Sequence, residues 1–158
     1  MKKHHVVINL AVIITLFIGA VYTAIQQDEH RIFYSVRKYT NKHGNAVVSL
    51  ETLTNFSWDE ALYFMYPTSP QEIEDALGVK YTGRIDLVSG LIFVRGGEIV
   101  YYELFTSGYD DLDWFPSKFG FNPNLSRADG ERMRIFMPSD NFEIKKLDSG
   151  YYFMGSLD

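Results

Sequence analysis

The chain has 158 residues, enough for one domain and an appendage, and its hydrophobic and aromatic fractions of 46% and 16% suffice to fill a core. Its formal net charge is −5. Two of the fifteen basic residues, Lys2 and Lys3, precede Ile25 and no acidic residue does, so the net charge beyond Ile25 is −7. An acidic surface repels phosphate backbones, which disfavours nucleic acid as a partner. The absence of cysteine excludes disulfides, thiolate metal sites, a catalytic thiol and lipid attachment through a lipobox.

The front of the chain has the layout of a signal anchor. Residues 1–5 include two lysines, and residues 6–25 are mostly apolar, close to the ~20 residues that span a bilayer. Residues 26–29, Gln-Gln-Asp-Glu, carry no positive charge. The positive-inside rule therefore predicts a cytoplasmic tail at 1–5, a transmembrane helix at 6–25 and everything beyond it outside the cell membrane.

A cleaved signal peptide has the same general layout and predicts a secreted protein instead. Cleavage after Ala24 places Tyr22 where a small residue belongs, and cleavage after Ala20 places Ile18 there. An uncleaved, single-pass anchor fits the sequence better.

Residues 26–44 are predicted to form a stalk or juxtamembrane helix. Ile32, Phe33, Val36 and Tyr39 recur at helical spacing before the chain breaks at 41–44. Such a helix either continues the anchor or is the first packed helix of the domain. The extracytoplasmic domain is expected to cover residues 45–158.

The stretch from Trp58 to Tyr66 organises this domain. It is almost unbroken in apolar and aromatic residues over one strand length, and Pro67 ends it because proline has no ladder donor. Residues 57–60, Ser-Trp-Asp-Glu, also fit a capping box, so a buried helix is the alternative. Length and aromatic content favour the strand.

A short helix follows this strand. Ser69 is an N-cap residue type, Pro70 occupies the first helical position, and Glu72 lies where its carboxylate reaches back to the cap. Gly78 supplies a left-handed stop. The buried stripe is predicted to consist of Ile73, Ala76 and Leu77.

Two β-rich runs, 86–95 and 98–105, flank Gly96-Gly97, a composition typical of a two-residue primed turn. Apolar residues fall on both faces of this hairpin, so it is predicted to be central in the sheet. The pairs expected from a regular register are Arg95–Glu98, Val94–Ile99, Phe93–Val100, Ile92–Tyr101 and Leu91–Tyr102.

The remaining chain adds shorter strands. Residues 46–50 form a short β-leaning run, and residues 106–130 are expected to be a loop pinned by aromatic side chains. Residues 131–137 alternate, and 141–147 with 151–154 form a closing hairpin. On the strand at 131–137, the apolar face is predicted to consist of Met133, Ile135 and Met137.

Strands grouped without βαβ alternation favour an α+β fold class. The predicted architecture is an N-terminal transmembrane helix followed by a small antiparallel-sheet domain with one short helix packed on it.

The pattern of Trp58-Asp59, Phe64, residues 67–69 (Pro-Thr-Ser), Glu72-Ile73 and Gly78 carries a family resemblance. It resembles an uncharacterised family of small bacterial proteins that place a signal or anchor segment before a compact extracytoplasmic α+β domain with a Trp-Asp…Pro-Tyr-Thr signature. The match covers about 25 residues, and Tyr66-Pro67 reverses the order of the family's Pro-Tyr. The resemblance implies a fold and a location but no activity or site residues.

Four residues are candidates for binding a ligand or partner. Trp58 and Asp59 place an aromatic face beside an acid, which suits cationic or sugar ligands. Tyr66 ends the same stretch, and Trp114 lies in the aromatic loop. The structural alternative makes Trp58 a core residue and Asp59 an acceptor of backbone N–H groups, and it makes the aromatic loop core filling.

Neither a catalytic nor a metal site is predicted, and no cofactor is expected. The acidic residues beside Trp114 lack the spacing and glycine of a calcium-binding loop and favour solvated turns. The four histidines lie outside the predicted core elements, which argues against a triad or metal cluster. The acidic residues are Asp110, Asp111 and Asp113, and the histidines are His4, His5, His30 and His43.

These features predict a membrane-anchored interaction module of the cell envelope that binds a protein or a ligand. One alternative is an envelope hydrolase that uses carboxylates such as Asp59 and Glu103. Another is an immunity-like inhibitor whose acidic face blocks a basic toxin.

Overall fold

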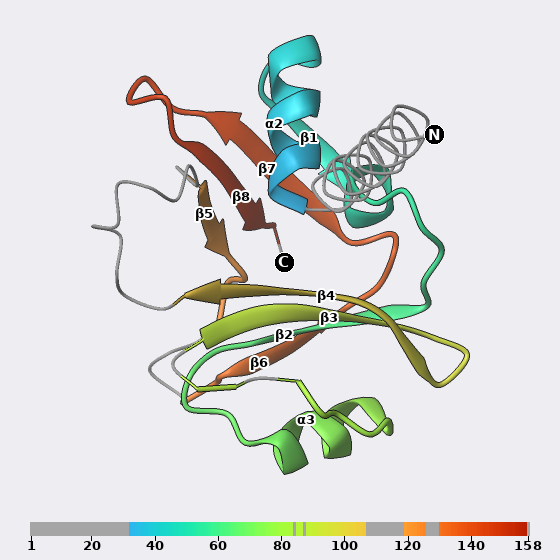
Figure 1. Ribbon diagram of the computed structural model, residues 1–158. Coiled ribbons are helices and arrows are strands. Elements are labelled where there is room, and N and C mark those ends of the chain that lie inside the picture. Colours follow the sequence, from blue (N-terminus) through green and yellow to red (C-terminus); the bar gives the residue numbers. More distant parts are fainter. Residues whose placement is uncertain (1–31, 84, 87, 107–118, 126–129, 158) are drawn as a thin grey trace, which may run out of the picture.

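The computed structural model describes residues 32–83, 85–86, 88–106, 119–125 and 130–157 (Figure 1). It shows two four-stranded sheets and two α-helices, which confirms the α+β class. The expectation of a single sheet is wrong, because a second sheet is present. The second helix, Ile32–His43, falls within the stretch 26–44 that was predicted to be helical. Within the described ranges no helix is long and apolar enough to cross a membrane, and the expected transmembrane segment lies outside them.

The inner sheet has the order β4-β3-β2-β6, and all its neighbours are antiparallel. β2 pairs with strands on both sides, so the strand interpretation of the organising stretch is confirmed and the helical alternative is wrong. Both faces of β2 and β3 are buried, which explains their nearly continuous apolar sequence. The strands are β2 (Glu60–Phe64), β3 (Val88–Arg95), β4 (Glu98–Thr106) and β6 (Met133–Phe136).

The β3–β4 hairpin turns at Gly96 and Gly97, whose φ angles are +57° and +79°. The first two expected pairs, Arg95–Glu98 and Val94–Ile99, are confirmed. The next three are wrong by one residue, because a β-bulge makes Val100 the extra residue and pairs Phe93 with Tyr101. The observed pairs beyond the bulge are Phe93–Tyr101, Ile92–Tyr102 and Leu91–Glu103.

The bulge follows from packing that lies outside the hairpin. It places the ring of Tyr101 on the same side as Phe56 and Phe93, with centroid distances of 5.1 and 5.9 Å. Tyr102 then points to the other face, where it is 50% exposed. The local hairpin sequence carries no signal for this shift.

Helix α3 (Pro70–Leu77) has the predicted boundaries, and its capping box is formed in both directions between Ser69 and Glu72. Gly78 ends the helix in the left-handed conformation with φ +65°. Ile73 and Leu77 are buried against the inner sheet. Local signals alone therefore account for this element.

The outer sheet has the order β1-β7-β8-β5. The closing hairpin β7–β8 is confirmed, but the expectation of a loop throughout 106–130 is wrong because β5 pairs in parallel with β8. The β5 sequence Phe-Gly-Phe-Asn is short and contains glycine, so only its pairing with a distant strand identifies it. The strands are β1 (Ala46–Ser49), β5 (Phe119–Asn122), β7 (Asn141–Lys146) and β8 (Tyr152–Ser156).

The expected apolar face of β6 is wrong at two of its three positions. Met133 packs, partly buried, against the core on the α3 side, but Ile135 and Met137 are 39% and 48% exposed, whereas Phe136 on the opposite face is 1% exposed. β6 is an edge strand of the inner sheet, and Phe136 packs edge-on against Phe142 of the outer sheet at 5.1 Å. Contact between the two sheets therefore determines which face of β6 is buried.

Helix α2 (Ile32–His43) packs into the core between the sheets, on the opposite side of the inner sheet from α3 (Figure 1). Ile32 and Val36 are fully buried, and the first N–H of the helix donates to the Glu103 carboxylate at 2.9 Å. The 3₁₀ helix η1 (Leu50–Leu53) lies beside α2. η1 forms one wall of a hollow on the surface of the domain.

Candidate functional site

Trp58 occupies the core. It is 6% exposed, its indole N–H donates to the Thr54 hydroxyl at 3.0 Å, and its ring meets Phe93 edge-on at 5.1 Å. The aromatic face that a cationic or sugar ligand needs is covered by other side chains of the domain.

Asp59 holds the β3–β4 turn. Its carboxylate accepts the N–H of Gly96 at 2.7 Å, and its own N–H donates to the Val94 carbonyl at 2.8 Å. Trp58 therefore points into the core while Asp59 points to the turn, and the two side chains do not share a ligand-binding face.

Tyr66 does not join this pair. Tyr66 is 48% exposed and precedes Pro67 with a cis peptide bond, at the far end of β2 from Asp59. Trp114 and the neighbouring acidic residues at 110–113 lie outside the described residues.

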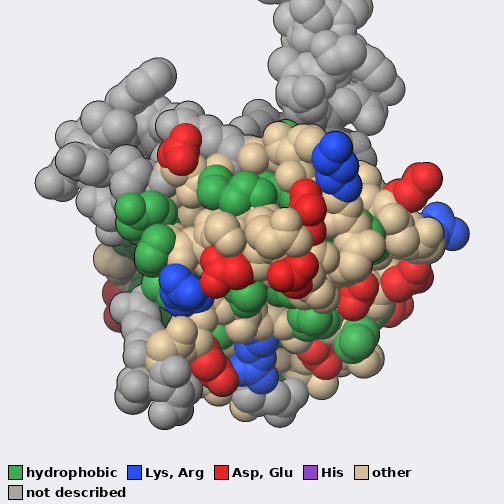
Figure 2. All heavy atoms as spheres, turned by 90° about the horizontal axis from the view of Figure 1, so that it is seen from below, with side chains coloured by type: hydrophobic (Ala, Val, Ile, Leu, Met, Phe, Trp, Pro, Cys, Tyr) green, Lys and Arg blue, Asp and Glu red, His purple; other side chains and the backbone are tan. Residues whose placement is uncertain are grey.

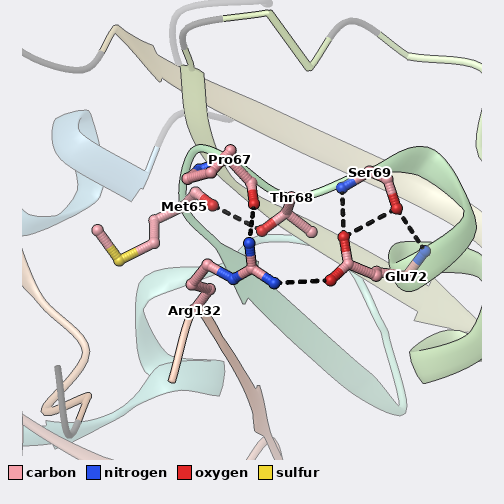
Figure 3. Close-up of polar contacts among 6 residues, drawn as sticks. All are labelled: Met65, Pro67, Thr68, Ser69, Glu72 and Arg132. Carbon is pink, nitrogen blue, oxygen red and sulfur yellow. Dashed lines mark hydrogen bonds and ion pairs between the residues drawn. The ribbon is translucent and has the colours of Figure 1, made fainter. Parts of the chain in front are cut away.

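The connection from β2 to α3 forms a polar corner with Arg132 (Figure 3). Arg132, just before β6, donates to the Pro67 carbonyl at 2.6 Å and to the Glu72 carboxylate at 2.9 Å. The same carboxylate accepts the backbone N–H of Ser69 at 2.7 Å. The corner joins the β2–α3 connection to β6, so Pro67, Ser69 and Glu72 have a structural role.

Glu72 gives the corner a predictable pH dependence. Hydrogen bonds from the backbone and hydroxyl of Ser69, with the charge of Arg132, lower the pKa of Glu72 from 4.5. Stability from this shift is present above pH 4.5 and is lost as the pH falls through the lowered folded-state pKa. Glu72→Gln should therefore destabilise the fold at about pH 7 and have a smaller effect at about pH 3 in urea unfolding.

A Ser69→Ala background provides the control for this prediction. Because the Ser69 hydroxyl is one cause of the lowered pKa, the pH-dependent part of the Glu72→Gln effect should shrink there. A Glu72→Gln effect of the same size at both pH values would contradict this explanation.

The carboxylates considered for hydrolysis are far apart. Asp59 binds the N–H of Gly96, while Glu103 pairs with Leu91 and binds the start of α2. Gly96 and Leu91 are five residues apart along the hairpin, about 17 Å at ~3.3 Å per residue. Glycosidase carboxylates lie about 5–9.5 Å apart, so this pair does not match that geometry. Among the described residues no group of three potential metal-ligating side chains converges.

A hollow lies between α2 and the chain from η1 to Asn55. Its volume is about 290 Å³. Lys38 lies over the ring of Tyr34 at 5.9 Å, and the rings of Tyr39 and His43 are 4.7 Å apart. The hollow is lined by Tyr34, Ser35, Lys38, Tyr39, Lys42, His43, Thr52, Leu53, Thr54 and Asn55.

The exposed side of α2 is positive, although the protein is acidic. Arg37, Lys38 and Lys42 are exposed, and the helix contains no acidic residue. These three charges, which we call the basic face, leave −8 for the rest of the chain. No described carboxylate forms an ion pair with any of them. A shallower depression of about 470 Å³ continues along the same face, past Asn41.

The hollow and the basic face were not predicted from the sequence. The spacing of Lys38 and Lys42, one helical turn apart, was a usable signal for a common face. The facing wall was not predictable, because tertiary packing brings η1 and residues 52–55 beside the helix.

Comparisons with protein-family models, curated proteins and solved structures found no match to this chain.

Proposed function

We propose that this protein is a single-pass membrane protein whose extracytoplasmic domain is a binding module of the cell envelope, and that the hollow on α2 binds an anionic component. The apolar segment at 6–25 and the flanking charges support the topology. The family resemblance of the stretch from Trp58 to Gly78 supports the same location.

The observation that carries the binding role is the basic face beside the hollow. Lysine ammonium groups on flexible stems bind phosphate or carboxylate oxygens. No described carboxylate forms an ion pair with Lys38 or Lys42, which supports a role for their charges in binding an anion. The rings of Tyr34 and Tyr39 add apolar contact within the same hollow.

A site-specific photo-crosslinker in intact cells tests this proposal. Placed at Thr52, which lines the hollow, it should form a discrete adduct. Placed at Lys145, in the outer sheet and paired with Glu143, it should not form that adduct. Lys38→Gln with Lys42→Gln should remove the Thr52 adduct, because both changes remove positive charge from the hollow.

The controls decide the outcome. Equal adducts at Thr52 and Lys145, or a Thr52 adduct that the double variant leaves unchanged, would contradict binding at the hollow. Mass spectrometry of the adduct identifies whether the bound component is lipid, polymer or protein.

A further inference from the structure

We infer that the anionic component is the phosphate headgroup of acidic phospholipids in the membrane that residues 6–25 are expected to enter. This inference rests on the proposed function and names the ligand of the same site. The basic face of α2 then docks the domain against the bilayer from which the chain emerges.

Chain length allows α2 to reach that bilayer. Six residues separate Ile25 from Ile32, and the seven Cα–Cα steps between them span at most roughly 25 Å. The twelve residues of α2 are about 18 Å long. A connection of this length lets α2 lie along the bilayer surface with its basic face against the headgroups.

The charge distribution gives the domain a preferred orientation at a negative surface. The α2 side carries the basic face, whereas α3, on the opposite side of the inner sheet, contains Glu72, Glu74 and Asp75 and no basic residue. Figure 2 views the molecule from the α3 side, and acidic side chains are prominent there. An anionic bilayer attracts the first side and repels the second.

The composition of the hollow suits the headgroup region. Tyr34 and Tyr39 are of a residue type enriched at membrane–water interfaces, where one end of the ring is apolar and the other hydrated. Lys38 and Lys42 combine apolar stems with charged ends that reach phosphate oxygens. This side of α2 thus offers both interactions that a headgroup layer makes.

The test uses the full chain reconstituted in vesicles of phosphatidylcholine, with or without phosphatidylglycerol. The protein has no cysteine, so Thr52→Cys carries a unique fluorophore beside the hollow, and exposed Lys80→Cys carries one just after α3. A headgroup spin-labelled lipid is the quencher. Phosphatidylglycerol should increase quenching at position 52 several-fold and leave position 80 unchanged.

Matched variants separate the effect of the basic face on docking from the effect of the protein's net charge. Each basic residue near an anionic surface contributes about a fivefold preference, so Arg37→Gln, Lys38→Gln and Lys42→Gln together should lower the docked-to-free ratio roughly a hundredfold. Lys80→Gln, Arg95→Gln and Lys145→Gln remove the same net charge elsewhere and should leave quenching at position 52 in place.

Three results would overturn the inference. The first two are equal quenching at position 52 in both kinds of vesicle and an equal loss of that quenching in both triple variants. The third is release of the domain from the vesicle surface by free inorganic phosphate at constant ionic strength. If the Thr52 crosslink instead captures a polymer or a protein and quenching does not depend on lipid, the inference fails while the proposed function stands. If no hollow-specific adduct forms either, both fail.

Discussion

Replacing Phe93 with alanine is expected to lower the free energy of unfolding by about 3–5 kcal/mol, the range for truncating a buried phenylalanine. The side chain is fully buried on β3, in the core shared by both sheets. It meets Trp58 at 5.1 Å and Phe56 at 5.3 Å, both edge-on. Because paired strands surround it, the cavity cannot collapse freely.

Urea unfolding of the wild type and the variant measures this change. Phe153→Ala is the control, because Phe153 is only partly buried, on β8 of the outer sheet, and should cost less. A loss of under about 1 kcal/mol for Phe93→Ala would show that Phe93 does not join the two sheets as described.

The second large effect is expected at Gly90, where alanine should destabilise the fold by about 1–3 kcal/mol through overpacking. An added Cβ would lie 2.8 Å from the Glu103 carbonyl oxygen and 2.9 Å from atoms of Leu104 and Phe64. The closest atom belongs to the backbone of β4, which cannot move without breaking its ladder with β3.

Gly120→Ala is the matched control for this prediction, since its added Cβ would meet only Phe153, at 3.6 Å. Both glycines lie in strands, so loss of glycine flexibility affects the two variants similarly. Equal unfolding free energies for Gly90→Ala and the wild type would contradict the close approach of β3, β4 and Phe64.

Elements with local signals were predictable from the sequence. Ser69, Glu72 and Gly78 define both ends of α3, and Gly96-Gly97 defines the central turn. Elements set by distant contacts were not predictable. β5 depends on parallel pairing with β8, and the bulge at Val100 depends on where Tyr101 packs.

The candidate site follows the same division. Adjacency in sequence suggested that Trp58 and Asp59 act together. In the structure the Trp58 side chain lies in the core and the Asp59 carboxylate binds the β3–β4 turn. Lys38 and Lys42 share a face by helical geometry alone. Their hollow exists only because η1 packs beside α2, so the wall that faces the helix could not be predicted from the sequence.

The topology on which the proposed function depends is tested by labelling single cysteines in intact spheroplasts with a membrane-impermeant maleimide. The proposed topology predicts that Lys80→Cys, exposed just after α3, is labelled before lysis and that Lys3→Cys, in the expected cytoplasmic tail, is labelled only afterwards. Labelling of Lys80→Cys only after lysis would place the domain inside the cell and contradict the proposed envelope role.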